Sequence, residues 1–247
     1  MAFIKRPRAP KDKWLQVSVF GLHTVALRTD GTVRAWGYNS SGQCNIPTDL
    51  GPCAAISGGA SYTIALRTDG SVRAWGRNDY GQCDIPTDLG PCTAIACGFF
   101  HTIALRTDGS VRTWGDNSFG QCNIPTDLGP CTAVAAGGHH TVALLEDGTV
   151  RAWGCNSSGQ CDVPTDLGPC TAVAAGEHHT VALLEDGTVR AWGSLYLNFE
   201  IPWELSDSGW YDFIANYDSD VKLTDVVPVR IRRTEKYRNI RLMTAMS

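Results

Sequence analysis

The sequence has no long apolar run, and it lacks the features that mark a secreted or membrane protein. Its 247 residues contain no apolar stretch of the ~18 residues that a membrane-spanning helix needs. The first 13 residues are basic, but no apolar segment follows them, as one would in a secretory signal. We therefore expect no membrane association and a cytoplasmic or nuclear location.

Patterns of common catalytic and metal sites are missing as well. There is no Ser-His-Asp set, paired-carboxylate site or phosphate-binding loop, and the glycines mark turns of a repeat. His139 and His178 lie in different repeats, which makes a poor case for a metal site. We expect a protein that is not an enzyme and has neither cofactor nor metal.

Basic charge is scarce in the middle of the chain. The net charge is −4, but residues 1–13 carry +4 and residues 228–247 carry +5, which leaves −13 between them. A nucleic-acid-binding domain needs a basic face on its folded part, so nucleic acid is not the expected partner. The basic end is interpreted as a solvated tail or as a segment for nuclear import or an acidic partner.

What the sequence does contain is a repeat of 39 residues. An Asp-Gly pair and a Trp-Gly pair both recur in phase, five times each. Fixed internal periods of this length indicate a repeat architecture. The tryptophans are Trp36, Trp75, Trp114, Trp153 and Trp192.

Each unit divides into short β-prone segments. In residues 132–170 we predict four strands at Thr132–Gly137, His140–Leu145, Thr149–Trp153 and Gln160–Val163. The Asp-Gly pair is expected to form a two-residue type I′ hairpin between the second and third strands. Four antiparallel strands per repeat make a propeller blade, and the bulky tryptophan is interpreted as packing between blades rather than as an exposed binding site.

The predicted fold is therefore an all-β propeller of four-stranded antiparallel blades, with five clear repeats plus a divergent C-terminal cap or sixth blade. We expect a basic tail at 1–13, propeller repeats within 14–205 (15–53, 54–92, 93–131, 132–170 and 171–205), and a divergent segment with a basic tail at 206–247. Three alternatives follow for the ring. It closes with the few blades that these repeats supply, it stays open, or the chain is part of a longer product. An open edge would favour self-association.

The repeat resembles a known family. Gly-x-x-His-Thr-Val-Ala-Leu, then Asp-Gly-Thr-Val, then Ala-Trp-Gly-x-Asn-x-x-Gly-Gln, is similar to the repeat of the regulator of chromosome condensation family, over about residues 15–193. The resemblance implies a propeller. It implies no single function, because this family includes a nucleotide-exchange factor for a small GTPase, an ultraviolet-B receptor, repeats of large ubiquitin ligases and a secreted β-lactamase inhibitor.

Specific residues decide between those functions. The uniform spacing leaves no room for the wedge that the exchange factor inserts into one blade. The photoreceptor has Trp after the first Gly of the motif, and a ligase needs a large catalytic domain with a nucleophilic Cys, neither of which is present here. We interpret the chain as a non-catalytic protein-binding propeller or scaffold. The alternatives are a guanine-nucleotide exchange regulator of a small GTPase and a propeller fragment of a larger ubiquitin ligase or assembly.

The five copies differ mainly in two loops, one before His-Thr and one after Trp-Gly. Because successive strands are antiparallel, both loops should lie at the same end of each blade. Aromatic residues mixed with charged ones are typical of protein-binding surfaces, although exposed loops also drift without function. The predicted partner-binding residues are Leu22, Tyr38, Ser61, Arg77, Asp79, Tyr80, Phe99, Phe100, Asp116, Phe119, His139, Glu177 and His178.

Two further residue types recur once per repeat. The His of the motif is replaced by Tyr62 in the second copy, which favours a structural hydrogen bond to backbone over a base or metal ligand. Pairs of cysteines with eight residues between them also recur. They could form disulfides, bind metal or be small buried apolar residues, and the distance expected between the two members of a pair favours the last of these. Cys155, in a variable loop, is the first candidate for a reactive thiol.

Overall fold

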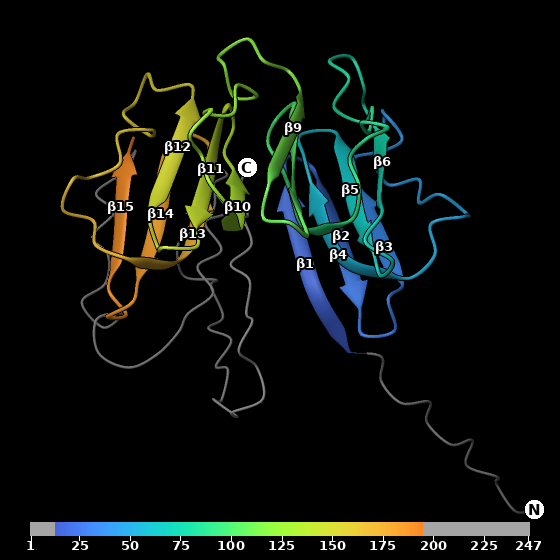
Figure 1. Ribbon diagram of the computed structural model, residues 1–247. Coiled ribbons are helices and arrows are strands. Elements are labelled where there is room, and N and C mark those ends of the chain that lie inside the picture. The colour runs from blue at the N-terminus through green and yellow to red at the C-terminus, as the bar shows by residue number, and fades with distance from the viewer. Residues whose placement is uncertain (1–12, 195–247) are drawn as a thin grey trace, which may run out of the picture.

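The computed structural model describes residues 13–194, and these form five three-stranded antiparallel sheets in chain order (Figure 1). The predicted tails and the divergent end lie outside the described residues. The first two sheets contain β1 (Trp14–Phe20), β2 (His23–Arg28), β3 (Val33–Gly37), β4 (Cys53–Gly58), β5 (Tyr62–Arg67) and β6 (Val72–Gly76). The other three contain β7 (Cys92–Cys97), β8 (His101–Arg106), β9 (Val111–Gly115), β10 (Cys131–Ala136), β11 (His140–Leu145), β12 (Val150–Gly154), β13 (Cys170–Ala175), β14 (His179–Leu184) and β15 (Val189–Gly193).

The predicted fourth strand is wrong. Residues 160 and 161 lie in a turn and residues 162 and 163 have no regular structure, because their backbone groups bond elsewhere. The N–H of Asp162 bonds to the carbonyl of Gly159, and the N–H of Cys161 bonds to the side chain of Asn156. The carbonyl of Gln160 accepts from the next repeat instead of from its own third strand. Each blade therefore has three strands, and no closed sheet is present between residues 13 and 194.

The hairpin also differs from the predicted two-residue type. The N–H of Gly31 bonds to the carbonyl of Arg28, and the N–H of Arg28 bonds to the carbonyl of Thr32. These bonds close a three-residue loop in which Gly31 has φ +85°. A three-residue loop with glycine in the left-handed region is the next most common hairpin connection. Asp30 stabilises it by accepting hydrogen bonds from the N–H and hydroxyl of Thr32.

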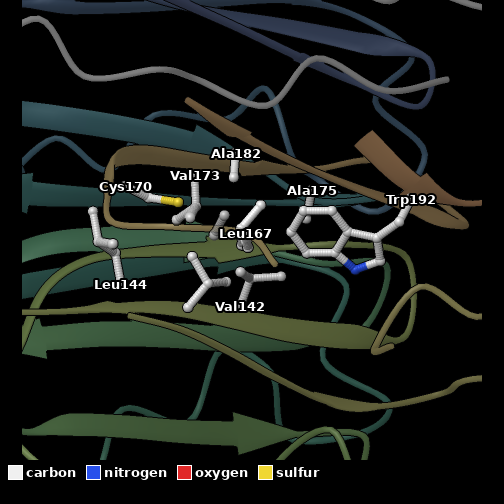
Figure 2. Close-up of a cluster of buried hydrophobic side chains, with 10 residues drawn as sticks. Val142, Leu144, Leu167, Cys170, Val173, Ala175, Ala182 and Trp192 are labelled. Carbon is white, nitrogen blue, oxygen red and sulfur yellow. The ribbon is translucent and has the colours of Figure 1, made fainter. Parts of the chain in front are cut away.

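Apolar side chains pack between consecutive blades. Figure 2 shows such a cluster between the fourth and fifth blades, where Val142 and Leu144 of β11 face Val173 of β13 and the ring of Trp192. The same positions recur at the earlier blade boundaries. Burial of these side chains supplies the main favourable term for holding the blades together.

The tryptophan of each repeat is fixed by the preceding repeat. Trp75 Nε1 donates to the carbonyl of Gln43, and the hydroxyl of Thr63 donates to the same carbonyl, at 2.9 Å in each case. Trp114, Trp153 and Trp192 make the same bond to Gln82, Gln121 and Gln160. Their predicted packing role is confirmed, since all four are at most 9% exposed.

The first blade is the exception. Trp36 is 50% exposed, and it has no hydrogen-bond acceptor among the described residues. Val17 is exposed too, whereas Ile56, at the corresponding position of the next blade, is completely buried. Within residues 13–194 no other blade packs on this side of the first blade, so this edge of the described array is open.

Candidate functional site

The two variable loops of each repeat lie at the same end of the blade, where they are hydrogen-bonded to each other. The N–H of Asp116, after Trp-Gly, bonds to the carbonyl of Phe100, before His-Thr, at 2.8 Å. The equivalent bond joins Cys155 to His139 and recurs in the other three repeats. In Figure 1, β12 runs upward, so this end of the blades is the upper one.

Ring contacts connect the variable loops of the second, third and fourth blades. Phe100 lies with its centroid 5.1 Å from that of Tyr80, and Phe99 lies 5.2 Å from the ring of His139. The ring of His139 is also 4.9 Å from that of Phe119. Tyr80 and Phe119 are about half exposed, at 47% and 52%, and the other three are half-buried. We call Tyr80, Phe99, Phe100, Phe119 and His139 the aromatic face.

A residue outside the predicted set anchors this face. Phe20, at the end of β1, is buried, and its ring packs edge-to-face against Phe99 at 5.3 Å. Phe99 of the third blade therefore connects the first blade with His139 of the fourth. The signal for Phe20 was present in the sequence, since Phe20 stands where the other repeats have Gly59, Gly98, Gly137 and Gly176.

Gly138 shapes the side of the aromatic face that meets the fifth blade. A Cβ atom at this position would lie 2.9 Å from a ring carbon of Phe99 and 3.1 Å from the carbonyl oxygen of Glu177. The carbonyl of Gly138 accepts a hydrogen bond from the N–H of Phe99. The absence of a side chain thus lets the loops of three blades approach one another closely.

Asp116 is the buried acidic group beside the aromatic rings, only 7% exposed. Burial opposes its ionisation, but hydrogen bonds from Ser118 and Gln121 outweigh that cost and lower its pKa. Its carboxylate lies 3.8 Å from Nδ1 of His139. Burial lowers the pKa of His139 despite the opposing attraction of Asp116 and Glu177, so His139 is neutral near pH 7 and Asp116 keeps its charge.

The remaining charged residues of the predicted set form local pairs. The guanidinium of Arg77 binds Asp79 at 2.6 Å and lies 5.3 Å from the centre of the Phe100 ring. His178 lies 3.2 Å from the carboxylate of Glu177. Leu22 and Tyr38, in the first blade, are exposed, and neither has a ring contact with the aromatic face among the described residues. Ser61 is half-buried, and its carbonyl accepts from the N–H of Arg77.

The repeated histidines have a structural position, as predicted, but with a different partner. His23, His101 and His140 are buried and lie within hydrogen-bond distance of a threonine hydroxyl of the next repeat. Tyr62 takes the same position and donates to the backbone carbonyl of His101. Burial lowers the pKa of His101 to about 4 and that of His140 to about 3. Neutral rings of this kind serve packing between blades.

All ten cysteines are free thiols. The second member of each pair is buried, and so is Cys97. The first member is half-buried, and its sulfur lies within hydrogen-bond distance of a backbone carbonyl. Burial raises the pKa of Cys161 to about 12 and that of Cys122 to about 11. Cys155 is half-buried with its sulfur 3.4 Å from the hydroxyl of Ser157, and its reactivity stays a prediction.

Two kinds of feature are absent from residues 13–194. No group of three or more His, Cys, Asp or Glu side chains in this part of the chain is arranged to hold a metal ion. No helix there is long and apolar enough to cross a membrane.

Solved structures with the same fold are numerous. Human WBSCR16 superposes with a TM-score of 0.67 at 20% identity, over 74% of this chain and 63% of that protein. Prp20p from Saccharomyces cerevisiae superposes with a TM-score of 0.63 at 23% identity, over 74% of this chain and 58% of that one. The CRINKLY WD40 ectodomain of the Arabidopsis thaliana receptor kinase ACR4 superposes with a TM-score of 0.61 at 23% identity, over 76% of this chain and 66% of that one. The chain thus spans less than two thirds of each of these proteins. At this level of identity the likeness establishes the fold alone.

Sequence comparison identifies the repeat itself. No curated protein sequence matches the chain significantly. The Regulator of chromosome condensation (RCC1) repeat matches residues 17–43, 53–82, 92–121, 131–160 and 170–194. These five matches cover more than half of the sequence, and each contains the three strands of one blade in whole or in large part. The chain therefore belongs to the family of RCC1-repeat proteins.

Proposed function

We propose that this protein is a non-catalytic binding module that docks another protein on its aromatic face. The observation that carries the proposal is the set of ring contacts that joins Tyr80, Phe99, Phe100, Phe119 and His139 across three blades. Exposed loops that drift without function would not be expected to assemble their aromatic residues into one cluster. Partly exposed aromatic clusters are enriched in the centres of protein interfaces.

The packing beneath the site supports the same proposal. Phe99 is held by the buried ring of Phe20 and by Gly138, so the aromatic face is shaped before any partner arrives. Binding then requires little ordering of side chains, which lowers the entropic cost of association. The outer rings, Tyr80 and Phe119, remain available for contact.

Affinity capture from a cell extract tests this function. The bait is the full chain, compared with a Tyr80→Ser, Phe119→Ser double variant, because these two rings are the exposed members of the cluster. Serine at Phe99 would disturb the buried Phe20 as well and would not separate binding from folding. A Leu15→Ser, Val17→Ser variant is the matched control, since it removes two exposed apolar side chains from β1, outside the aromatic face.

A partner that is retained by the wild type and the control but lost by the double variant supports the proposal. Identical partners for all three baits would rule it out. If the captured partner is a small GTPase whose nucleotide release the protein accelerates, the exchange-regulator alternative replaces the simple binding module.

A further inference from the structure

The charges around the aromatic face are almost all of one sign. Arg77 is the only lysine or arginine on the variable loops within residues 13–194, and its charge is matched by Asp79. Three acidic side chains lie on these loops: Asp79, Asp116 and Glu177. Two more, Asp84 and Asp162, accept hydrogen bonds from the repeated Asn of a loop. The upper end of the blades is therefore acidic.

The negative charge of Asp116 is not neutralised locally. Its partners are the hydroxyl and N–H of Ser118 and the amide of Gln121, all of them uncharged donors that favour the ionised carboxylate. His139 Nδ1 lies 3.8 Å from the carboxylate of Asp116, but burial lowers the pKa of His139, so that ring is uncharged near pH 7. A carboxylate held in this way beside aromatic rings favours a cation above them.

The aromatic rings can take such a cation. A guanidinium or ammonium group within about 6 Å of an aromatic centroid is attracted by the electron-rich ring face. The protein already contains one example, since Arg77 lies 5.3 Å from the centroid of Phe100. Phe119 has a half-exposed ring on which no cation of residues 13–194 lies, and it belongs to the same loop as Asp116.

From this juxtaposition we propose that the aromatic face recognises a basic segment of a partner protein, with an arginine or lysine side chain lying on Phe119 beside Asp116. The inference rests on the proposed function and adds the chemistry of the partner. Glu177, which like Phe99 lies close to Gly138, gives a second acidic group for a neighbouring cation of the same segment.

Peptide titrations followed by fluorescence polarisation test the inference with the full chain at low ionic strength. The probes are a labelled Gly-Ser peptide that carries several arginines and a peptide of the same length with glutamates in their place. We expect only the arginine peptide to bind, and added salt to weaken it because exposed charges are screened. Phe119→Ser and Asp116→Asn should each weaken binding roughly three- to tenfold, the size expected for loss of a cation–π contact or a charge partner.

Glu185→Gln is the matched control, because it removes one exposed acidic group from the opposite end of the blades. Circular dichroism of each variant verifies that it is folded. Equal affinity of the arginine peptide for all variants, or binding of the glutamate peptide, would overturn the inference. A third probe with the sequence of residues 228–247 identifies another occupant: if it alone binds in a manner that depends on Phe119, the site serves this chain's own basic end and not a partner.

The two proposals can fail separately. If capture yields a partner that the Tyr80, Phe119 variant loses while no arginine peptide binds, the protein-binding function stands and the basic partner is wrong. If the arginine peptide binds without dependence on Phe119 or Asp116, its binding reflects general acidity of the protein, and the inference is wrong whatever the capture shows.

Discussion

Trp114 Nε1 donates a hydrogen bond of 3.0 Å to the backbone carbonyl of Gln82, which belongs to the preceding repeat. The hydroxyl of Thr102 donates to the same carbonyl at 2.8 Å. One carbonyl group thereby joins two strands of the next blade, and its use explains why the segment around it does not pair as a fourth strand. Blade-to-blade bonding has replaced bonding within the blade.

This relationship predicts unequal effects of the same substitution in two repeats. Trp114→Phe removes the indole hydrogen bond and part of a buried side chain, so it should lower the free energy of unfolding by about 1–3 kcal/mol. Trp36→Phe is the matched control in the first repeat, where the side chain is 50% exposed. It should lower the free energy of unfolding by no more than about 0.5 kcal/mol. Urea denaturation measures both, and equal losses would show that Trp36 is covered in solution.

The sequence was informative where the repeat constrains every copy alike. The 39-residue period and the alternation of short β-prone segments with Gly-containing turns predicted the strands and the end of the blade on which the variable loops lie. The sequence was misleading for Gln160–Val163, because a short polar-apolar segment before a proline has the same pattern as a strand. The carbonyl of Gln160 instead accepts hydrogen bonds from the next repeat. Phe20 was missed although it replaces the glycine of the other four repeats, because that difference does not reveal which ring it contacts, and Phe99 lies two repeats further along the chain.

Buried histidines should make the protein sensitive to acid. The pKa of His101 is about 4 in the folded protein, and an unfolded histidine has a pKa of ~6.5. The stability gained by keeping this ring neutral is fully present above pH 6.5 and is lost as the pH falls toward 4. By linkage the loss for one such group reaches about 3 kcal/mol.

His101→Tyr tests that contribution with the residue that the second repeat already uses, Tyr62. Tyrosine does not gain charge in acid, so the variant should lose less stability than the wild type between pH 6.5 and pH 4. Urea denaturation at several pH values gives the comparison. A variant with unchanged acid sensitivity would mean that His101 is not a source of it.

Ion pairs between repeats should contribute little. Arg112 binds Asp88 of the preceding repeat at 2.9 Å, but both side chains are substantially exposed, and the same pair recurs as Arg73–Asp49, Arg151–Asp127 and Arg190–Asp166. A double-mutant cycle of Arg112→Met and Asp88→Asn should give a coupling energy below about 1 kcal/mol that decreases with salt. A coupling energy several times larger, or one that salt does not change, would contradict this expectation.

Gly138→Ala should alter the aromatic face without preventing folding. Gly138 is outside the positive φ region that favours glycine, so the backbone admits alanine, and the difficulty is space. The new methyl group would press on the ring of Phe99 and the backbone of Glu177, and overpacking of this kind costs about 1–3 kcal/mol. Because the ring of Phe99 yields more easily than the Glu177 backbone, the contact between Phe99 and His139 should weaken or disappear.

Nuclear Overhauser effects between these two rings, measured in the wild type and the Gly138→Ala variant, check the displacement. Ala60→Gly is the control, since Ala60 has the corresponding position in the second repeat and its replacement should leave the Phe99–His139 contact intact. Retention of that contact in Gly138→Ala would mean that the loop of the fifth blade moves instead, and that Gly138 does not set the position of Phe99.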